Sequence, residues 1–375
     1  MRAVNFKDRR RFLRGSLATG ATAALGTTLL GTNKLLADDG PRSLTRGDAA
    51  ILRFLAAAEL IETDLWQQYN ELGGVNGGNP SYMAALSNLD EDMPQYISDN
   101  TDDEMSHVAF LNAYLESKGE EPVNFDRFRT LPSSKATGAK QIGRLTNLMK
   151  LNVDTSWYRR YRSEENPDDG ANIGQALQIH GEPAIPLNDS DTPPNNPAPV
   201  PPASNSDRRM QAIANTAGFH FASIEQGGSS LYSTMALKAT NLEVLRIVVS
   251  IGGSEVNHFA VWHDKAGNAV AQPLAGVTDP ETGVHFPDFN SAPFGGPLFQ
   301  TNLIFPEPCD FIGNERLPPC SIIRPTRDAL AGAVATINFF TKELLFLGQS
   351  DAFFRKVMQL AAAADAAQRE IDRDR

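Results

Sequence analysis

Two short motifs carry the residues of this chain that are best suited to chemistry. Each places a glutamate three positions before a histidine, Glu104 with His107 and Glu255 with His258. In a helix this spacing puts both side chains on adjacent turns of one face, so both can reach a single point. The chain has only six histidines, so two such pairs are unusual for its composition. The plain alternative for each pair is a capped or surface histidine beside a solvated glutamate.

Each motif is preceded by an acid in matching surroundings. Glu59 and Glu225 both lie in stretches that are otherwise small or apolar, and an aromatic residue, Trp66 or Tyr232, follows each of them seven positions later. A carboxylate in such surroundings must be neutralised, paired or bound to a metal. The chain therefore repeats, twice, a helix with one glutamate followed by a helix with a Glu-x-x-His pair.

Together these residues form a set of four carboxylates and two imidazoles, namely Glu59, Glu104, His107, Glu225, Glu255 and His258. One glutamate from each of two helices, with a Glu-x-x-His pair from each of two others, is the ligand set of a carboxylate-bridged di-iron or di-manganese centre. Oxygen ligands suit both metals, so the sequence predicts two Fe or Mn ions without choosing between them. Six ligands for two ions also leave positions at which dioxygen, peroxide or water could bind.

Several residues near the predicted ligands have alternative roles. Glu62 lies one turn from Glu59 and is its rival as a ligand. Symmetry with Glu225 favours Glu59, and Glu62 is then expected beside the site or at the surface. Trp66 and Tyr232 are expected to be core aromatics or redox relays, and in either role they would shield the metals from water.

The other four histidines are not expected to bind the metals. His220 and His263 each lie five residues from a predicted ligand, which places them about 140° around the helix from it. We expect both to be packed or exposed. His180 and His285 lie in predicted loops and carry little functional signal.

Two glycine pairs, Gly227-Gly228 and Gly252-Gly253, interrupt helical patterns close to the predicted ligands. A glycine inside a helix costs roughly 1 kcal/mol relative to alanine. The pairs therefore predict a close approach of two helices, a bulge, access for a small substrate or, as the plain alternative, a break in the helix.

The spacing of apolar residues predicts four long helices that would bring these side chains together. They are expected at about 47–72, 98–119, 207–238 and 241–265. Ser98, Asp99 or Asn100 would cap the second helix, Gly119 would follow its end, and Ser206 or Asp207 would cap the third. Residues 120–206 include eight prolines between 183 and 202 and predict a long surface connection. Two helix pairs joined by one long crossover outline a mainly α protein, a four-helix bundle.

The chain continues past the predicted bundle. Residues 268–325 are rich in glycine, proline, asparagine and phenylalanine, and we expect them to be irregular or short-stranded. A helical region is expected from about 327 to 373, with an interruption near Gly348. Cys309 and Cys320 lie in a proline-bounded loop and predict a disulfide if the protein is exported, two idle thiols being the alternative.

Two segments carry a resemblance to a known family. They are Asp103-Glu104-Met105-Ser106-His107-Val108-Ala109-Phe110-Leu111 and, with supporting similarity, Ala58-Glu59-Leu60-Ile61-Glu62-Thr63-Asp64-Leu65-Trp66. The chain resembles the ferritin-like superfamily, especially the exported ferritin-like domain proteins related to plant desiccation-associated proteins. The resemblance covers about 46–119 and 207–266. We therefore expect a ferritin-like bundle over 46–266, with 120–206 as an insertion and 267–375 as an irregular and helical extension.

The resemblance also implies a role for each ligand. It implies two bridging carboxylates, two terminal carboxylates and one imidazole on each ion: Glu104 with Glu255, Glu59 with Glu225, and His107 with His258, respectively. Family members often have tyrosine where this chain has Trp66. The long crossover and the extension have no counterpart in a minimal ferritin, so a storage cage is not expected, while a smaller homo-oligomer stays open.

The N-terminus predicts export. Residues 1–37 hold seven Lys/Arg against one acid, and the segment Asp8-Arg9-Arg10-Arg11-Phe12-Leu13-Arg14 precedes a mildly apolar stretch over 15–36. This order is typical of a twin-arginine signal peptide, which would direct the protein to the periplasm or outside the cell. An uncleaved membrane anchor is the alternative, but threonines and glycines make the stretch a poor spanning helix. No membrane anchor is expected after cleavage.

The rest of the chain is acidic, which excludes some function classes. The formal net charge is −11 for 375 residues, and without the basic N-terminus it is about −17 for 38–375. An acidic protein of this kind repels the phosphate backbone of nucleic acids, so we expect no nucleic-acid partner. The sequence also lacks a phosphate-binding loop, a convincing dinucleotide fingerprint and a Gly-x-Ser-x-Gly nucleophile motif.

Three functions fit these observations, in decreasing order of support. The first is redox chemistry on a small oxidant, peroxide or dioxygen, with catalase-like or ferroxidase-like activity. The second is a stress-related or desiccation-related protein that binds metal or partners without turnover. The third, a scaffold with a vestigial site, is weakest because all six ligand positions are filled.

Overall fold

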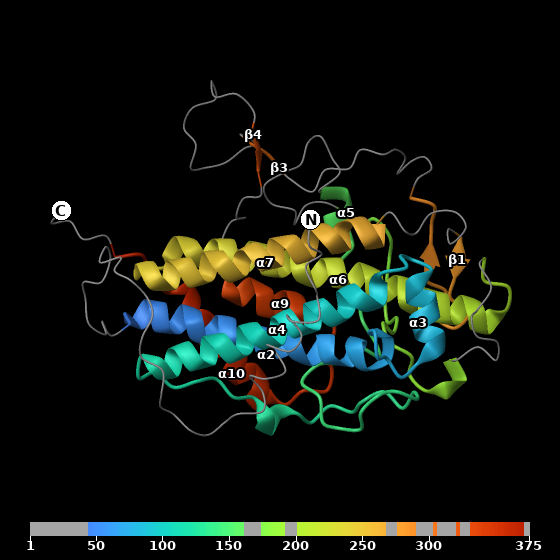
Figure 1. Ribbon diagram of the computed structural model, residues 1–375, viewed down its shortest axis with the longest axis horizontal. Coiled ribbons are helices and arrows are strands. Elements are labelled where there is room, and N and C mark those ends of the chain that lie inside the picture. Colours follow the sequence, from blue (N-terminus) through green and yellow to red (C-terminus); the bar gives the residue numbers. More distant parts are fainter. Residues whose placement is uncertain are drawn as a thin grey trace, which may run out of the picture. The chain divides into compact units, whose positions relative to one another are not determined.

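Four long helices lie side by side and form the centre of the fold (Figure 1). They are α2 (Arg46–Gly73), α4 (Met93–Ser117), α6 (Asn205–Lys238) and α7 (Leu242–Gly267). The computed structural model describes residues 44–160, 174–191, 201–267, 276–289, 303–305, 320–322 and 331–370. Helix α2 packs along α4 and α6 packs along α7, while contacts of α2 with α6 and of α4 with α7 join the two pairs. The expected mainly α bundle is confirmed.

Helix α2 begins where its sequence offers a cap. The Thr45 side chain accepts a hydrogen bond from the backbone N–H of Asp48 at 3.0 Å, which satisfies one of the free donors of the first turn. The Asp48 carboxylate accepts from the backbone N–H of Thr240 at 2.9 Å and also from that of Asn241. One buried acid thus ties the start of α2 to the turn between α6 and α7.

The predicted start of the second helix was wrong. Helix α4 begins at Met93, after Asp92, so Ser98, Asp99 and Asn100 lie inside it rather than capping it. Ser98 and Asn100 are buried, because they face α2 and the bundle interior. The end was predicted correctly, since Gly119 has a φ of +77° just past the helix, a conformation that glycine adopts easily.

The third and fourth helices match their predicted ranges closely. Helix α6 begins at Asn205, and its cap is Ser204 rather than the predicted Ser206 or Asp207. Asp207 completes a reciprocal capping box with Ser204. Both α6 and α7 continue through their glycine pairs, so the pairs do not break the helices.

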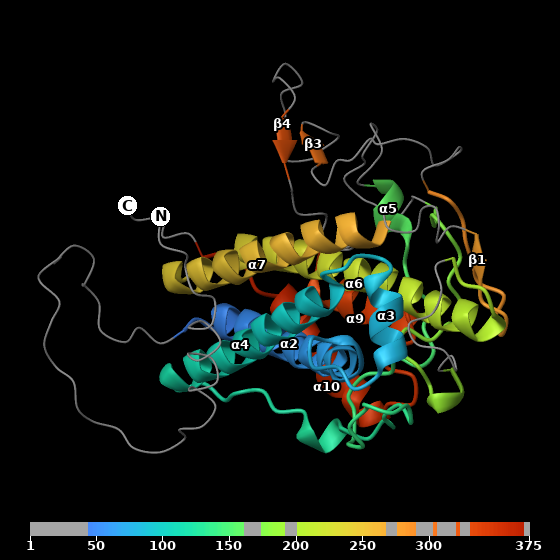
Figure 2. The ribbon, with the colours of Figure 1, turned by 45° about the vertical axis from the view of Figure 1, so that its right-hand side comes forward.

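Helix α3 (Pro80–Ser87) lies at one end of the bundle and packs against α6 and α2 (Figure 2). The described parts of the long crossover contain only short elements, η1 (Asp126–Phe128), α5 (Ser156–Arg160) and η3 (Asp189–Asp191). A buried acid of α2, Asp64, holds this crossover by accepting from the backbone N–H groups of Leu145 at 3.0 Å and Thr146 at 2.9 Å. The crossover is therefore fixed to the bundle by hydrogen bonds as well as by apolar packing.

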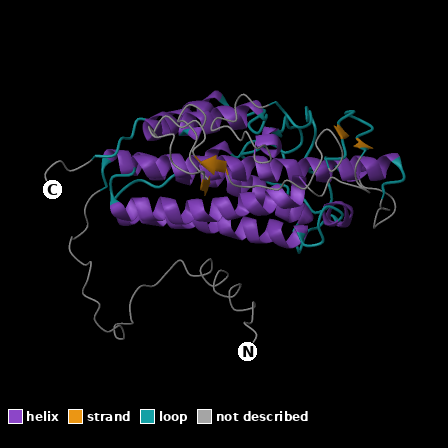
Figure 3. Ribbon diagram, turned by 90° about the horizontal axis from the view of Figure 1, so that it is seen from above, coloured by secondary structure: helices purple, strands orange, loops and turns teal. Residues whose placement is uncertain are grey.

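The described residues of the C-terminal part include two antiparallel strand pairs and two helices. Strands β1 (Val277–Thr278) and β2 (His285–Phe286) pair with each other, as do β3 (Leu303–Phe305) and β4 (Cys320–Ile322). Helix α9 (Ala333–Lys342) packs against α6, and α10 (Asp351–Asp365) packs against α2 and α9. Figure 3 shows the long helices from above, with their axes roughly parallel to one another. Gly348, with φ +94°, lies between α9 and α10, where the interruption was expected.

Two predictions fall outside the described part of the chain. The signal peptide over 1–37 lies entirely there, and so does Cys309 of the predicted disulfide. Within the described residues, no helix combines the length and the apolar character needed to cross a bilayer.

Candidate metal centre

The structure brings the six predicted ligands together in the middle of the bundle. They come from all four long helices: Glu59 from α2, Glu104 and His107 from α4, Glu225 from α6, and Glu255 and His258 from α7. The four carboxylates are at most 1% exposed, and the two histidines are 9% and 6% exposed. Burying so many ionisable groups costs free energy unless cations or protons neutralise them.

The six residues form two overlapping groups, in each of which the possible ligand atoms lie within 4.8 Å of one another. One group contains Glu59 and His107, the other contains Glu225 and His258, and Glu104 and Glu255 belong to both. Two neighbouring cations that share two carboxylates would need an arrangement of this kind.

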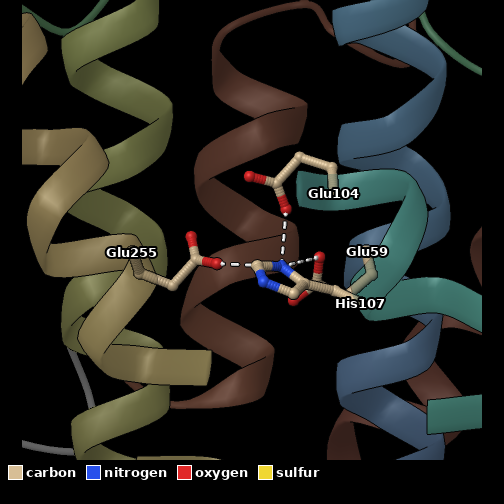
Figure 4. A group of neighbouring side chains, drawn as sticks. All are labelled: Glu59, Glu104, His107 and Glu255. Carbon is tan, nitrogen blue, oxygen red and sulfur yellow. Dashed lines mark hydrogen bonds and ion pairs between the residues drawn. The ribbon is translucent and has the colours of Figure 1, made fainter. Parts of the chain in front are cut away.

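The first group surrounds the ring of His107 (Figure 4). Its Nδ1 atom lies 3.1 Å from Glu104 Oε2, 3.3 Å from Glu59 Oε2 and 3.5 Å from Glu255 Oε1. Three carboxylates from three helices thus converge on one imidazole nitrogen.

The second group is built in the same way around His258. Its Nδ1 atom lies 3.1 Å from Glu104 Oε1 and 3.3 Å from Glu225 Oε2. Its other nitrogen, Nε2, lies 3.2 Å from Asp103 Oδ2. A carboxylate on the outer nitrogen fixes the tautomer and ring orientation of a metal-binding histidine, so Asp103 holds Nδ1 toward the interior.

Several atoms that face this interior form no well-aligned hydrogen bond among the described residues, although some of them lie in the close histidine–carboxylate contacts given above. They are Glu59 Oε2, Glu225 Oε2, both carboxylate oxygens of Glu255 and His258 Nδ1. Buried polar atoms are almost always paired, and these five are lone-pair donors of the kinds that Fe and Mn accept. The residues therefore fit a pair of divalent cations.

The two aromatic residues that follow the outer glutamates hold the carboxylates from opposite sides. Trp66 Nε1, on the same helix as Glu59, donates to Glu225 Oε1 at 3.0 Å. Tyr232 Oη, on the same helix as Glu225, donates to Glu59 Oε1. Each aromatic thus orients the glutamate of the other helix pair.

Sequence reasoning missed two further members of this hydrogen-bond frame. The Asn100 side-chain amide donates to Glu104 Oε1 at 2.8 Å and to Glu225 Oε1 at 3.0 Å. Trp262 Nε1 in turn donates to Asn100 Oδ1 at 2.8 Å. Trp262 follows Glu255 by seven positions, the same spacing that separates Trp66 and Tyr232 from their glutamates. This spacing could have identified Trp262 from the sequence. Asn100 gave no such signal because its position suggested a helix cap.

Burial and neighbouring charges shift the titration of these groups in opposite directions. Burial raises the pKa of Glu59 to about 8, and burial with the negative charges of neighbouring glutamates raises the pKa of Glu255 well above its usual range. Burial alone would also raise the pKa of Glu104, but hydrogen bonds from His107 and His258 outweigh it and lower that pKa. Protons thus balance part of the negative charge.

The histidines are shifted toward their protonated form. Burial alone would lower the pKa of His107, but the charge of Glu59 and hydrogen bonds to Glu104 and Glu59 raise it to about 12. The pKa of His258 is raised for the same kind of reason, with Glu225 as the leading charge against burial. Bound cations would replace these protons.

Glu62, the rival of Glu59, is also buried, at 3% exposure. Burial and then the charge of Glu255 raise its pKa well above the usual range. It lies beside the six residues without belonging to either group, which places it next to the site and not at the surface.

The remaining histidines lie outside both groups. His220 and His263 are buried, whereas His180 and His285 are exposed in the described loops and strands. His220 Nδ1 and the hydroxyl of Tyr69 form a hydrogen bond of 2.7 Å, a contact that the sequence did not suggest.

Two of the four glycines near the centre allow a close approach. A Cβ atom on Gly228 would lie 2.5 Å from Glu255 Oε2, and one on Gly252 would lie 2.8 Å from the Cβ of Tyr232. A Cβ on Gly253 would meet no atom within 4 Å, and one on Gly227 would touch only Phe339 at 3.9 Å. Gly228 therefore makes room for a carboxylate of the site.

Comparison with known proteins agrees with this geometry. A family model described as a ferritin-like domain matches residues 47–268, which include the four long helices except Arg46, the first residue of α2, and all six converging side chains. No curated protein and no solved structure matches the chain.

Proposed function

The chain belongs to the ferritin-like domain family, and we propose that it is a di-metal carboxylate protein that acts on peroxide or dioxygen. The observation that carries the proposal is the pair of four-residue groups that share Glu104 and Glu255. We propose that the site binds two Fe or Mn ions as cofactors, one in each group.

The donor set supports this choice of metals. His107 would bind one ion and His258 the other, Glu59 and Glu225 would each bind one ion, and the two shared glutamates would bridge them. Carboxylate oxygen and imidazole nitrogen suit iron and manganese. Such ions supply one-electron steps between the +2 and +3 states, which suit the reduction of a small oxidant.

The protein's own contribution is orientation and exclusion of water. Trp66 and Tyr232 each donate to an outer glutamate, and Asn100 donates to one shared and one outer glutamate. These donors hold carboxylate oxygens in fixed positions before a metal arrives. The apolar packing of the four helices keeps bulk water away from the same atoms.

The exposure of the ligands supports a small substrate. The side chains of His107 and His258 are 11% and 7% exposed, whereas the glutamates they face are at most 1% exposed. The outermost ligands thus lie on α4 and α7 and leave little open surface. This low exposure favours peroxide or dioxygen as the substrate over a larger organic molecule.

The test of turnover compares three histidine variants of the metal-loaded protein. We expect His107→Ala and His258→Ala to reduce the consumption of hydrogen peroxide, or of Fe(II) under air, by at least roughly tenfold. The matched control is His180→Ala, which removes an exposed loop histidine and should leave the rates unchanged. Equal rates in all three variants would argue for a protein that binds metal without turnover.

We further propose that the protein works after export by the twin-arginine route. The support is the Arg9-Arg10 pair with its mildly apolar following stretch, and a centre that could be loaded before export of the folded protein. Replacing Arg9-Arg10 by Lys-Lys should retain the protein in the cytoplasm, as measured by cell fractionation. Continued export of this variant would contradict the route and leave the metal site untouched.

A further inference from the structure

We propose that Tyr69 is a redox-active tyrosine, with His220 as its proton acceptor and Trp66 as its electronic link to the metal centre. This inference rests on the proposed function for the source of the oxidant. The residues lie in the bundle interior, on α2 and α6, and none of them belongs to either ligand group.

The proton path is a single short hydrogen bond. Tyr69 Oη and His220 Nδ1 are 2.7 Å apart, and both residues are fully buried. Because a neutral imidazole has one protonated nitrogen, donation by the phenol to Nδ1 places the ring proton on Nε2. That atom lies 3.8 Å from Glu343 Oε2, a carboxyl group that also accepts from Ser223 at 2.9 Å.

The electron path is equally short. Trp66 Nε1 is hydrogen-bonded to the predicted ligand Glu225 at 3.0 Å, and its ring centroid lies 5.7 Å from that of Tyr69. Trp66 also stacks on Trp262, with ring centroids 5.5 Å apart. Trp262 in turn donates a hydrogen bond to Asn100. Indole and phenol are the protein side chains most easily oxidised by one electron besides thiols, and these rings are adjacent.

The proposed step balances in electrons and protons. Metal ions held by the six converging side chains would supply, with peroxide or dioxygen, the one-electron oxidant, which would take one electron from Trp66 and be reduced by it. Trp66 regains an electron from Tyr69, while the phenolic proton moves to Nδ1 of His220. The result is a neutral tyrosyl radical beside an imidazolium, and return of one electron and the proton restores the pair.

The electrostatics allow this transfer only when it is coupled to oxidation. Burial raises the pKa of Tyr69 well above its usual range, so no tyrosinate forms at rest. Burial lowers the pKa of His220 to about 3, so the imidazole is neutral and free to accept at Nδ1. A phenol that has lost an electron is a far stronger acid than the phenol itself, so the proton then moves to the imidazole.

A second buried tyrosine shows what a purely structural hydroxyl looks like in this fold. Tyr82 is also fully buried, and its hydroxyl donates to the backbone carbonyl of Ala184 at 2.7 Å. A backbone carbonyl satisfies a buried hydroxyl but cannot take up its proton. Tyr69 differs in having a basic partner and an aromatic link to the centre.

The test generates the oxidant in two independent ways. In the first, the metal-free full chain is photo-oxidised with a ruthenium(III) tris-bipyridine complex made by flash quenching, and radicals are followed by electron paramagnetic resonance. The chain has seven tyrosines, so we assign to Tyr69 the component of the tyrosyl signal that Tyr69→Phe removes and the matched Tyr82→Phe retains. The same signal in wild type and Tyr69→Phe would overturn the proposal.

His220→Gln separates proton transfer from hydrogen bonding. Glutamine can still accept a hydrogen bond from Tyr69 but cannot take its proton, so we expect the radical to form roughly a hundredfold more slowly, the size typical of losing a positioned base. An unchanged rate would overturn the role of His220. If the variant does not fold, the rate of the wild-type protein in D₂O serves instead, and the absence of a solvent isotope effect would overturn the coupled step.

In the second arm, hydrogen peroxide is added to the metal-loaded protein. We expect the Tyr69 radical in wild type and its loss in Trp66→Phe. A radical by photo-oxidation but not by peroxide in metal-loaded protein would overturn the link to the centre. A chain that binds no metal would instead contradict the proposed function, while the photochemical result would still decide the Tyr69–His220 pair.

Discussion

At the scale of single residues, the candidate metal centre depends on a missing side chain as well as on the ligands and their hydrogen-bond donors. Gly228 is the clearest case, because its missing side chain leaves space that Glu255 occupies. The two outer glutamates, by contrast, depend on donors placed on the opposite helix pair, Trp66 and Tyr232. A ligand set read from the sequence is therefore incomplete without the small residue and the donors that position it.

The first prediction concerns this space. Gly228→Ala would place a Cβ atom 2.5 Å from Glu255 Oε2, so Glu255 must move and we expect metal content to fall roughly tenfold. Gly253→Ala is the control, because its Cβ meets no atom within 4 Å. It should keep its metal and gain up to about 1 kcal/mol of stability from helix propensity. Equal metal content in both variants would show that Glu255 does not need this space.

The second prediction concerns protons. Glu59, with a pKa of about 8, and His107, with a pKa of about 12, hold protons at neutral pH. A metal ion must displace these protons, so binding should release protons and should become tighter as pH rises from 6 to 8. Titration calorimetry in buffers with different ionisation enthalpies measures the number released. Affinity that falls over the same range would contradict the assignment of these groups as ligands.

At the scale of elements, the crossover is held by buried acids more than by regular structure. Asp64 of α2 accepts from two backbone N–H groups of the crossover and from Arg129 Nη1 at 2.6 Å. The α9 start is held similarly, since Asp365 of α10 accepts from the N–H groups of Ala333 and Val334. Segments outside the four long helices are thus fixed to them at defined points.

The third prediction follows from this anchoring. Asp64→Asn loses one acceptor oxygen and the charge that faces Arg129, so we expect it to destabilise the fold by about 2–3 kcal/mol in urea unfolding. Asp126→Asn is the matched control, because Asp126 faces the same arginine at 3.6 Å with a side chain that is 78% exposed. Its effect should stay within about 0.5 kcal/mol. Similar losses in both variants would contradict the anchoring role.

The fourth prediction is a pH dependence of stability from Glu343, in the turn after α9. Burial raises its pKa from 4.5 to about 8. Between these values the folded state holds a proton that the unfolded state has lost, so stability falls as pH rises through this window. Glu343→Gln keeps the oxygen that accepts from Ser223 but cannot ionise.

In the wild-type protein this carboxyl should lower the free energy of unfolding by on the order of 1 kcal/mol per pH unit between pH 5 and 8. The variant should lack this contribution. Urea unfolding at several pH values measures it, with Glu116→Gln as an exposed control on α4. An unchanged slope in Glu343→Gln would mean that this carboxyl does not titrate in that window.

Prediction from sequence succeeded for features that repeat along one helix. The spacing of apolar residues located α2, α6 and α7 to within about two residues at each end, the usual precision of such boundaries. It failed at the start of α4, because Ser98 and Asn100 are residue types that favour caps, yet here they are buried in contacts with other helices. The seven-residue spacing to an aromatic would have identified Trp262 had it been applied to Glu255.

Contacts between distant parts of the chain could not be predicted in this way. The Tyr69–His220 bond joins residues 151 positions apart on different helices, and its distance depends on how α2 packs against α6. The burial of Glu343 could not be predicted from the sequence either. Its hydrogen-bond partners, Ser223 and Asp154, come from α6 and from the crossover.

At the scale of the whole molecule, the fold is two helix pairs that each contribute half of the candidate metal centre. The pair α2–α4 supplies Glu59 and the first Glu-x-x-His motif, and the pair α6–α7 supplies Glu225 and the second. Because both groups share one glutamate from each pair, neither pair contains a complete group. The acidity of the chain is thus partly an interior property, since each of the four converging glutamates is at most 1% exposed.

The number of metal ions bound per chain decides whether the six side chains form a metal centre. We predict two Fe or Mn ions per chain for protein matured in its native host, measured by mass spectrometry of the digested protein, and almost none in Glu104→Ala/Glu255→Ala. Glu116→Ala/Glu243→Ala is the control, because it removes the same charge from exposed positions of the same two helices. Fewer than one ion per wild-type chain, or equal metal content in the two double variants, would contradict the metal centre.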